Sequence, residues 1–406
     1  MESSNQEHFF ETDAQQAKRQ QRAKKEENTF GNPLRMNSKV LAVIPDPKKP
    51  HTSVFTAESG GRVSRIDTEP RTDHKQSRTT TAKYTGPSVP VTCLAIGGAG
   101  SETIFAGSWD KTVWSWDMST RKLGRRYDGH SDFVKAVACG RLGDKHVLIS
   151  GGADKKIIVW DIETGRKLHT LQDAASSASM MSLQSLAVDP VLSTAEEIVL
   201  VSASSDPHIR RWKITPTGVS QLPTEAAKAT TAGEERLTIQ EHETSVYKVV
   251  FDVTGEEVDL WSASADGTAK CLLREKGFTA EDVLEHGDFV RAIALTNDWV
   301  VTGGISQVIK VWDRTSGELY AAIDAHFDEI TDLVVLRDPA GRSDVLCSIG
   351  IDCTLRTWPL DRKGLDGVVE EIRAAADGKK EEEEENKEGL MTAEEEAELA
   401  ALMEDD

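Results

Sequence analysis

The sequence of 406 residues contains little of what many catalytic and membrane-bound classes require. Its five cysteines include no CxxC pair and no Cys/His cluster with the spacing of a zinc site. It has no glycine-rich phosphate loop and no apolar run near the roughly 18 residues that a membrane span needs, and its first residues lack the apolar segment of a signal peptide. We therefore expect a soluble protein of the cytoplasm, the nucleus or both, with no metal, no cofactor and no membrane contact.

The charge of the chain is strongly acidic, with a formal net value of −20. Residues 361–406 contain 18 acidic and 6 basic residues, so this tail contributes −12 and the other residues −8. Proteins that bind nucleic acid usually carry a basic footprint. The composition therefore indicates other proteins as partners, and RNA only as part of a complex.

A short pattern of residues is repeated six times, and a seventh, degenerate copy precedes the others. The pattern is most complete at His130, Ser150, Asp154 and Trp160. Copies lie 40 to 60 residues apart, which suits units of about 40–45 residues with loop insertions. The residues that end the seven units are Ile66, Trp116, Trp160, Trp212, Leu272, Trp312 and Trp358.

Each unit is built from short β-branched runs around a tight turn, as in residues 147–150 and 157–160. This pattern predicts antiparallel strands joined by hairpins, and we find no helical period between Val40 and Trp358. A unit of this size cannot bury its apolar face alone, so the units must stack or close into a ring. The sequence predicts an all-β array.

These residues resemble the WD40 family of β-propellers over roughly residues 39–360. The resemblance implies a seven-bladed propeller, which we assign to residues 29–360, with residues 29–35 supplying the outer strand of the last blade. Pro33 is compatible with such an edge position.

The resemblance also implies a structural tetrad in which a Trp, a Ser or Thr, a His and an Asp hydrogen-bond to one another. Leaving one of these buried groups unpaired would cost roughly 1–3 kcal/mol. Copies in blades 1, 2, 4, 5 and 6 are incomplete; blade 5 has Leu272 for the tryptophan and blade 6 has Ser306 for the aspartate. The complete tetrads are expected at His130, Ser150, Asp154 and Trp160 in blade 3, and at His326, Ser348, Asp352 and Trp358 in blade 7.

A Ser, a His and an Asp in one unit also match the composition of a hydrolase triad. A nucleophilic serine needs an exposed hydroxyl and an oxyanion hole, usually at one site per protein. Here the set recurs, and its serines lie inside predicted strands. We therefore expect structural tetrads and no enzymatic activity.

Three segments outside the blades have distinct compositions. Residues 1–28 form a polar arm with a basic run at residues 18–25, which suits either a solvated arm or a nuclear import signal. Residues 215–236 are expected to form a flexible surface loop. The acidic tail, residues 361–406, contains a capping box that predicts a short helix at residues 393–403, which either docks through its apolar stripe or frays.

One face of the ring carries the loops that enter the innermost strands, and the family commonly binds partners there. Aromatic and arginine side chains dominate binding hot spots. The alternative is that some of these rings pack into the top of the central channel. Carried over from the family, the expected partner-binding residues are Trp109, Phe133, Lys135, Tyr247, Phe289, Arg291 and Glu329.

The leading functional hypothesis is a noncatalytic scaffold or adaptor that binds other proteins through this face and assembles a multiprotein complex. The alternative is an accessory propeller subunit of an RNA-processing or tRNA-modifying enzyme, similar to the fungal subunit of the tRNA guanine-N7 methyltransferase. A third class, an enzyme in its own right, has no candidate residues in this sequence.

Overall fold

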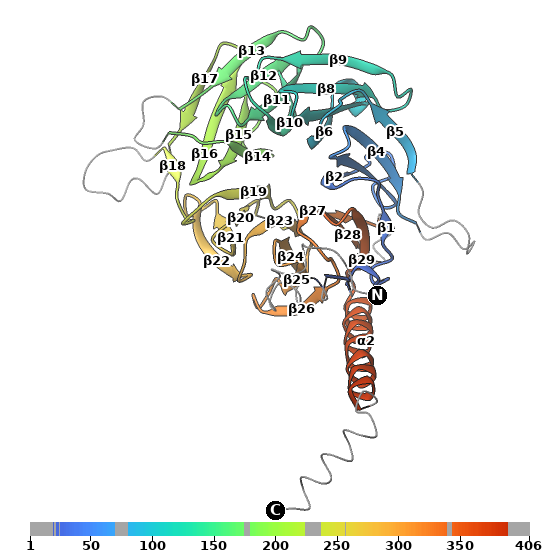
Figure 1. The fold of residues 1–406 in the computed structure, drawn as a ribbon. Coiled ribbons are helices and arrows are strands. Elements are labelled where there is room, and N and C mark those ends of the chain that lie inside the picture. The colour runs from blue at the N-terminus through green and yellow to red at the C-terminus, as the bar shows by residue number, and fades with distance from the viewer. Residues whose placement is uncertain are drawn as a thin grey trace, which may run out of the picture.

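The computed structural model describes residues 19, 22–23, 25–69, 80–173, 179–223, 237–255, 257–338 and 343–388. Their strands form seven antiparallel sheets arranged as blades around a central axis (Figure 1). Six blades have four strands, and the fourth has a short fifth strand that pairs with β16. The predicted seven-bladed, mostly β propeller is therefore confirmed.

The first four blades follow one another along the chain. Blade 1 comprises β2 (Val40–Pro45), β3 (Ser53–Glu58), β4 (Arg62–Asp67) and β5 (Thr80–Thr85). Blade 2 comprises β6 (Val91–Gly97), the 3-10 turn η2 (Ala99–Ser101), β7 (Thr103–Ser108), β8 (Thr112–Asp117) and β9 (Leu123–Asp128). Blade 3 comprises β10 (Val134–Leu142), β11 (Lys145–Gly152), β12 (Ile157–Asp161) and β13 (Lys167–Leu171). Blade 4 comprises β14 (Leu183–Val188), β15 (Ile198–Ser204), β16 (Asp206–Thr215), β17 (Gly218–Leu222) and β18 (Thr238–Ile239).

Blades 5 and 6 follow in chain order, and blade 7 joins the two ends of the propeller. Blade 5 comprises β19 (Val246–Phe251), β20 (Leu260–Ser264), β21 (Thr268–Leu273) and β22 (Thr279–Glu285). Blade 6 comprises β23 (Val290–Leu295), β24 (Trp299–Gly304), β25 (Val308–Asp313) and β26 (Leu319–Asp324). Blade 7 comprises β27 (Ile330–Leu336), β28 (Val345–Gly350), β29 (Thr354–Pro359) and the N-terminal strand β1 (Leu34–Arg35).

The core of the protein is divided among the interfaces between blades. Among the described residues, seven clusters of buried apolar side chains occur, and each joins two neighbouring blades. The innermost strands touch in sequence around the axis, and β27 of blade 7 contacts β2 of blade 1. Because each interface removes apolar surface from water on both sides, the ring is stabilised by closing on itself.

Closure depends on the segment before blade 1. Leu34 pairs with Leu355 and Arg35 with Thr354, which makes β1 the outer strand of blade 7 as we predicted. The Thr357 amide donates to the Gly31 carbonyl at 2.9 Å, so the pairing continues upstream of β1. The Trp358 ring covers Gly31, where an added Cβ would lie 2.5 Å from the indole.

A long helix follows blade 7 where we expected no helix. Helix α2 (Arg362–Glu388) starts at Asp361, whose carboxylate accepts the Gly364 amide at 2.9 Å as an N-cap. Its first turns pack against the outer side of blades 6 and 7, and the helix then projects from the rim (Figure 1). The helix predicted at residues 393–403 lies outside the described residues. No described helix is both long enough and apolar enough to cross a membrane.

Part of the expected loop at residues 215–236 is a strand. Thr215 and Gly218 pair across a tight turn, and β17 then forms the outer strand of blade 4. The turn residues between them, Pro216 and Thr217, explain why this segment lacked an obvious strand pattern. Residues 224–236 of the insertion, and most of the predicted arm before Arg22, lie outside the described residues.

Gly31→Ala tests the closure of the ring, with Gly143→Ala as its matched control. Both glycines have left-handed backbone angles, with φ of +65° and +66°. Only Gly31 faces a neighbour, because nothing lies within 4 Å of a Cβ at Gly143. Gly31→Ala should therefore lower the free energy of unfolding by about 1–3 kcal/mol more than Gly143→Ala in urea titrations. Equal losses would show that the Trp358 contact does not stabilise the closed ring.

Candidate partner-binding face

The tetrad residues of blades 3 and 7 lie within hydrogen-bond distance of one another. In blade 3, His130 Nδ1 is 2.9 Å from Asp154 Oδ1, and His130 Nε2 is 2.8 Å from Ser150 Oγ. The Trp160 indole donates to the same Ser150 oxygen at 2.8 Å. Because Asp154 accepts the Nδ1 proton, Nε2 accepts the serine proton, and each polar group in the chain of bonds has a partner.

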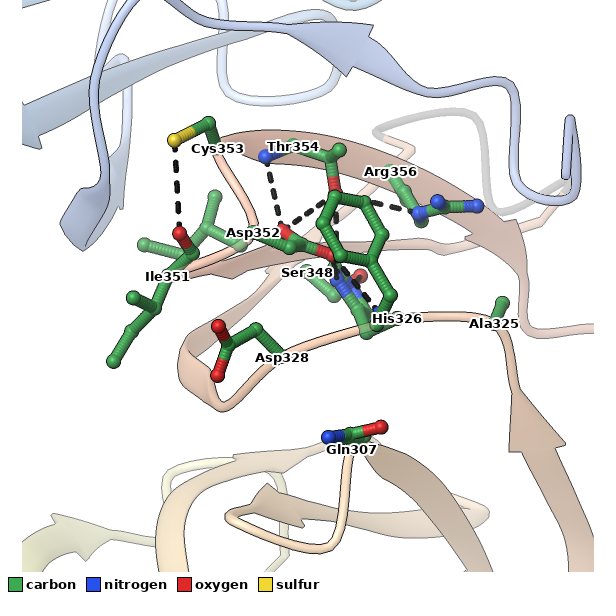
Figure 2. Close-up of polar contacts among 12 residues, drawn as sticks. Gln307, Ala325, His326, Asp328, Ser348, Ile351, Asp352, Cys353, Thr354 and Arg356 are labelled. Atoms are coloured by element: carbon green, nitrogen blue, oxygen red, sulfur yellow. Dashed lines mark hydrogen bonds and ion pairs between the residues drawn. The ribbon is translucent and has the colours of Figure 1, made fainter. Parts of the chain in front are cut away.

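Blade 7 repeats this arrangement (Figure 2). His326 contacts Asp352 at 2.7 Å and Ser348 at 2.8 Å. Burial raises the pKa of the Asp352 carboxyl, but hydrogen bonds from His326 and Thr354 outweigh burial and hold that pKa below its ordinary value. The carboxylate is therefore ionised and fixes the loop that carries His326.

Blade 6 keeps the tetrad hydrogen bonds, with Ser306 in place of the aspartate. Here the imidazole is turned over: His286 Nδ1 contacts Thr302 at 2.9 Å and Nε2 contacts Ser306 at 2.8 Å. The Trp312 indole completes the set by donating to Thr302. Burial and then the Lys310 ammonium lower the pKa of His286 to about 4, and the Asp288 carboxylate offsets only part of this shift.

Blade 4 replaces the missing histidine with an arginine that the sequence did not identify. Arg210 is fully buried, and its guanidinium donates to Asp173, Asp206 and Ser204 at 3.0–3.2 Å. The Trp212 indole still donates to Ser202 at 2.9 Å. Asp173 lies 37 residues before Arg210, so no local pattern marks this pair.

Blade 2 has a second tryptophan in place of the missing histidine as the donor to the turn aspartate. The Trp114 indole donates to Asp110 at 2.7 Å, which is the acceptor that a histidine contacts in other blades. Trp116 donates instead to the Thr85 carbonyl at 3.0 Å. The turn aspartate is thus anchored in blade 2 as well, by a different donor.

A recurring backbone hydrogen bond holds the loops of one face in the same register. In each case the residue before the turn between the second and third strands donates its amide to the loop that enters the innermost strand. These bonds measure 2.7–3.2 Å and run from Trp109 to Pro90, Ala153 to Phe133, Ser205 to Ser182, Ala265 to Ser245, Ile305 to Phe289 and Ile351 to Glu329.

This register brings the candidate binding residues to one face, where they form a set that we call the channel-mouth patch. Trp109, Phe133 and Phe289 are 44%, 38% and 46% exposed, and the first two stack with ring centroids 4.9 Å apart. The other members are half-buried. The patch consists of Trp109, Phe133, Lys135, Tyr247, Phe289, Arg291 and Glu329.

Part of the patch lines a cavity in the central channel. The cavity has a volume of about 410 Å³, and Trp109, Lys135, Tyr247 and Arg291 are among its walls. Phe133 and Phe289 are not among them. The patch is therefore a rim of exposed rings around a partly polar opening.

The charged members of the patch differ in their partners. Arg291 pairs with Glu329 and lies over the Tyr247 ring at 4.4 Å. Lys135 forms neither a hydrogen bond nor an ion pair with any residue that the structure describes. Burial and then the nearby Arg291 lower the pKa of the Lys135 amine. An acceptor entering the channel would meet this amine.

Comparison with known families agrees with the fold and the repeats. A model described as WD domain, G-beta repeat, matches residues 78–117. A second, described as the tRNA methyltransferase TRM82 WD40 domain, matches residues 127–257. The chain therefore contains WD40-like repeats in these two segments, and its structure is a seven-bladed propeller.

Relatives of this chain include one that matches over its full length. This chain is 27% identical over 416 residues to "Uncharacterized WD repeat-containing protein C126.01c" of Schizosaccharomyces pombe, and the match covers all of both chains. It is 37% identical over 73 residues to small ribosomal subunit protein RACK1y of Oryza sativa subsp. japonica, over 18% of this chain and 21% of the relative. It is 38% identical over 84 residues to pre-mRNA-splicing factor PRP46 of Candida albicans, over 20% and 21%.

Trp160→Phe should destabilise the WD40 propeller by roughly 1–3 kcal/mol, because Ser150 loses its indole donor while the buried volume changes little. Trp261→Phe is the matched control. Both tryptophans are 3% exposed, but Trp261 Nε1 has no hydrogen-bond partner in the described part of the chain. Urea titrations should show a smaller loss of unfolding free energy for Trp261→Phe than for Trp160→Phe. Equal losses would show that the Trp160–Ser150 hydrogen bond does not stabilise the fold.

Ser306→Asp should reduce the acid sensitivity that His286 contributes. The pKa of His286 in the folded chain, about 4, lies below its ordinary 6.5, so the unfolded chain binds the proton more readily between these values. Stability from this group is present above pH 6.5 and falls toward pH 4, by about 2 kcal/mol between pH 7 and pH 5. A carboxylate at position 306 would raise this pKa and shrink the loss. Urea titrations of both proteins at pH 7 and pH 5 measure the difference, and an unchanged difference would refute the assignment.

Proposed function

We propose that this WD40 propeller is a noncatalytic subunit that holds a protein partner at the channel-mouth patch and so assembles a multiprotein complex. The observation that carries the proposal is the exposure of three aromatic rings on one rigid face, at Trp109, Phe133 and Phe289. Large exposed rings cost little side-chain entropy to bind and dominate interface hot spots.

The rigidity of the face supports a binding role. The loops that carry the patch are fixed by the tetrads beneath them and by the recurring backbone bonds described above. A preorganised surface loses less conformational entropy when a partner binds. The patch is therefore suited to bind a partner surface of complementary shape without rearranging.

The charge around the channel favours protein over nucleic acid. Arg291 is paired with Glu329, and Lys248 is paired with Asp332 across the cavity at 3.0 Å. Carboxylates at this position repel phosphate, whereas a phosphate-binding surface presents unpaired cations in a continuous stripe.

A noncatalytic role agrees with the burial of the tetrad serines. Ser150 and Ser348 are fully buried, and each hydroxyl is already bonded to an indole and an imidazole. A nucleophile must reach its substrate. The Ser, His and Asp sets therefore serve the fold.

A second candidate is a noncatalytic accessory subunit of a tRNA methyltransferase. The specific observation is the match of residues 127–257 to the TRM82 WD40 domain, which spans blades 3 and 4 and the start of blade 5. In that case the partner at the patch, or at another surface of the ring, is the catalytic subunit. The two candidates share the scaffold role and differ in the partner.

Phe289→Ala should weaken partner capture by about 2 kcal/mol, near thirtyfold, while the fold stays intact because the ring is 46% exposed. Leu319→Ala is the control, since Leu319 is 45% exposed on the outer strand β26. Native purification of the tagged chain and both variants, with quantitative mass spectrometry and thermal melting, measures the effect. Undiminished recovery with Phe289→Ala would reject the patch. Assay of the wild-type complex for guanine-N7 methylation of tRNA tests the second candidate.

A further inference from the structure

The charged side chains in the walls of the channel cavity are paired, with one exception. All seven innermost strands contribute to these walls, and the charged wall residues are Lys135, Lys248, Arg291 and Asp332. Lys248 Nζ lies 3.0 Å from Asp332 Oδ1, and Arg291 pairs with Glu329. The Lys135 amine forms no hydrogen bond or ion pair with a described residue. The cavity therefore has one cation without a counter-ion in the part of the chain that the structure describes.

The surroundings of Lys135 favour an anion beside it. Its side chain is half-buried at the start of β10. Burial and then the Arg291 guanidinium lower the pKa of the Lys135 amine, and the Asp132 carboxylate offsets only part of this shift. A partly desolvated ammonium is stabilised by an opposite charge within hydrogen-bond distance. A ligand that brings one acceptor of negative charge would supply what the walls lack.

The balance of charge selects a carboxylate over a phosphate. The pairs Lys248–Asp332 and Arg291–Glu329 are each neutral overall, so one negative charge is sufficient to balance Lys135. A phosphoserine or phosphothreonine carries about −1.5 to −2 charges at neutral pH. The excess charge of a phosphate would be repelled by the carboxylates of Asp332 and Glu329. An Asp or Glu side chain matches the site without this excess.

The cavity has the size and the further donors that a carboxylate side chain needs. Its volume of about 410 Å³ lies within the range of pockets that hold small molecules, roughly 300–1,000 Å³. The Tyr247 hydroxyl and the Trp109 indole are on the same walls, and neither donates to a described residue. A carboxylate has two oxygens that accept several hydrogen bonds. At the opening, the stacked rings of Trp109 and Phe133 offer an apolar surface to a neighbouring side chain.

We propose that the protein partner inserts an Asp or Glu side chain into the channel and pairs it with the Lys135 ammonium. An apolar or aromatic side chain next to that residue packs on the Trp109 and Phe133 rings. This inference rests on the proposed function and names the chemistry of the partner: a segment in which a carboxylate stands beside an apolar residue.

A phage-displayed library of random peptides, selected on the immobilised full-length chain, tests this preference. Peptides recovered on the wild-type chain should share one acidic position beside an apolar residue. Lys135→Met should abolish the preference for an acid, and Lys135→Glu should replace it with Lys or Arg, because the unbalanced charge changes sign. Recovery of no peptide, or of peptides without a shared acid, would overturn the inference.

The pairing itself is tested with synthetic copies of one selected peptide that carry Glu, Gln or phosphoserine at the acidic position. Fluorescence anisotropy should show that Gln weakens binding to the wild-type chain about tenfold, but to Lys135→Met less than about twofold. Lys167→Met is the matched control, because Lys167 is exposed on β13 of the same blade, and it should behave as the wild type. Thermal melting verifies the fold of each variant. Equal losses in wild type and Lys135→Met, or tighter binding of phosphoserine than of Glu, would refute the carboxylate pairing.

Native purification separates this inference from the proposed function. A partner that is lost with Phe289→Ala but fully recovered with Lys135→Met would overturn the pairing and leave the binding face in place. A partner that is lost with Lys135→Met and retained with Lys167→Met would support the pairing. Undiminished recovery with both Phe289→Ala and Lys135→Met would reject the proposed function and the inference that rests on it.

Discussion

Closure of the ring is the constraint on which the rest of this structure depends. Each blade buries apolar side chains against both neighbours, so an open array would leave one face of blade 1 and one face of blade 7 in water. The seam is secured twice, by the apolar cluster between blades 7 and 1 and by β1 on the outside of β29. The fully buried Arg356 adds two hydrogen bonds to the seam, because its guanidinium donates to the Asn28 side-chain oxygen and to the Phe30 carbonyl at 2.6 Å each.

Within the closed ring, blades 2 to 7 anchor the equivalent loops, but the residues that do so vary. A histidine serves this purpose in blades 3, 5, 6 and 7, an arginine in blade 4 and a tryptophan in blade 2. What the blades share is a buried donor aimed at an acceptor in the turn, because an unpaired polar group there would destabilise the fold. The geometry of the face that carries the channel-mouth patch is therefore maintained although the sequence pattern varies between blades.

The sequence predicted the parts of this fold that repeat. The recurring tryptophans and the strand pattern around Ser150 were sufficient for the number of units and their strands, and the resemblance to the WD40 family supplied the closing segment. The anchors at Arg210 and Trp114 were missed because they replace the family residues and act through partners with no fixed spacing. Helix α2 was missed because Gly364 and Gly367 lie in its first turns and weaken its helical pattern. Its apolar residues do have helical spacing, but the face that they form is recognisable only where it packs against blades 6 and 7. These residues are Leu365, Val368, Val369 and Ile372. The exposure of the patch residues depends on neighbouring blades and was not readable from sequence.

Helix α2 leaves the rim beside blades 6 and 7 (Figure 1), whereas the first described residues contact loops of these two blades on the face that carries the channel-mouth patch. The two ends of the propeller therefore depart from one sector of the ring in different directions. An anchor attached through α2 would hold the ring edge-on, with the channel-mouth patch facing sideways and blade 3 at the far side.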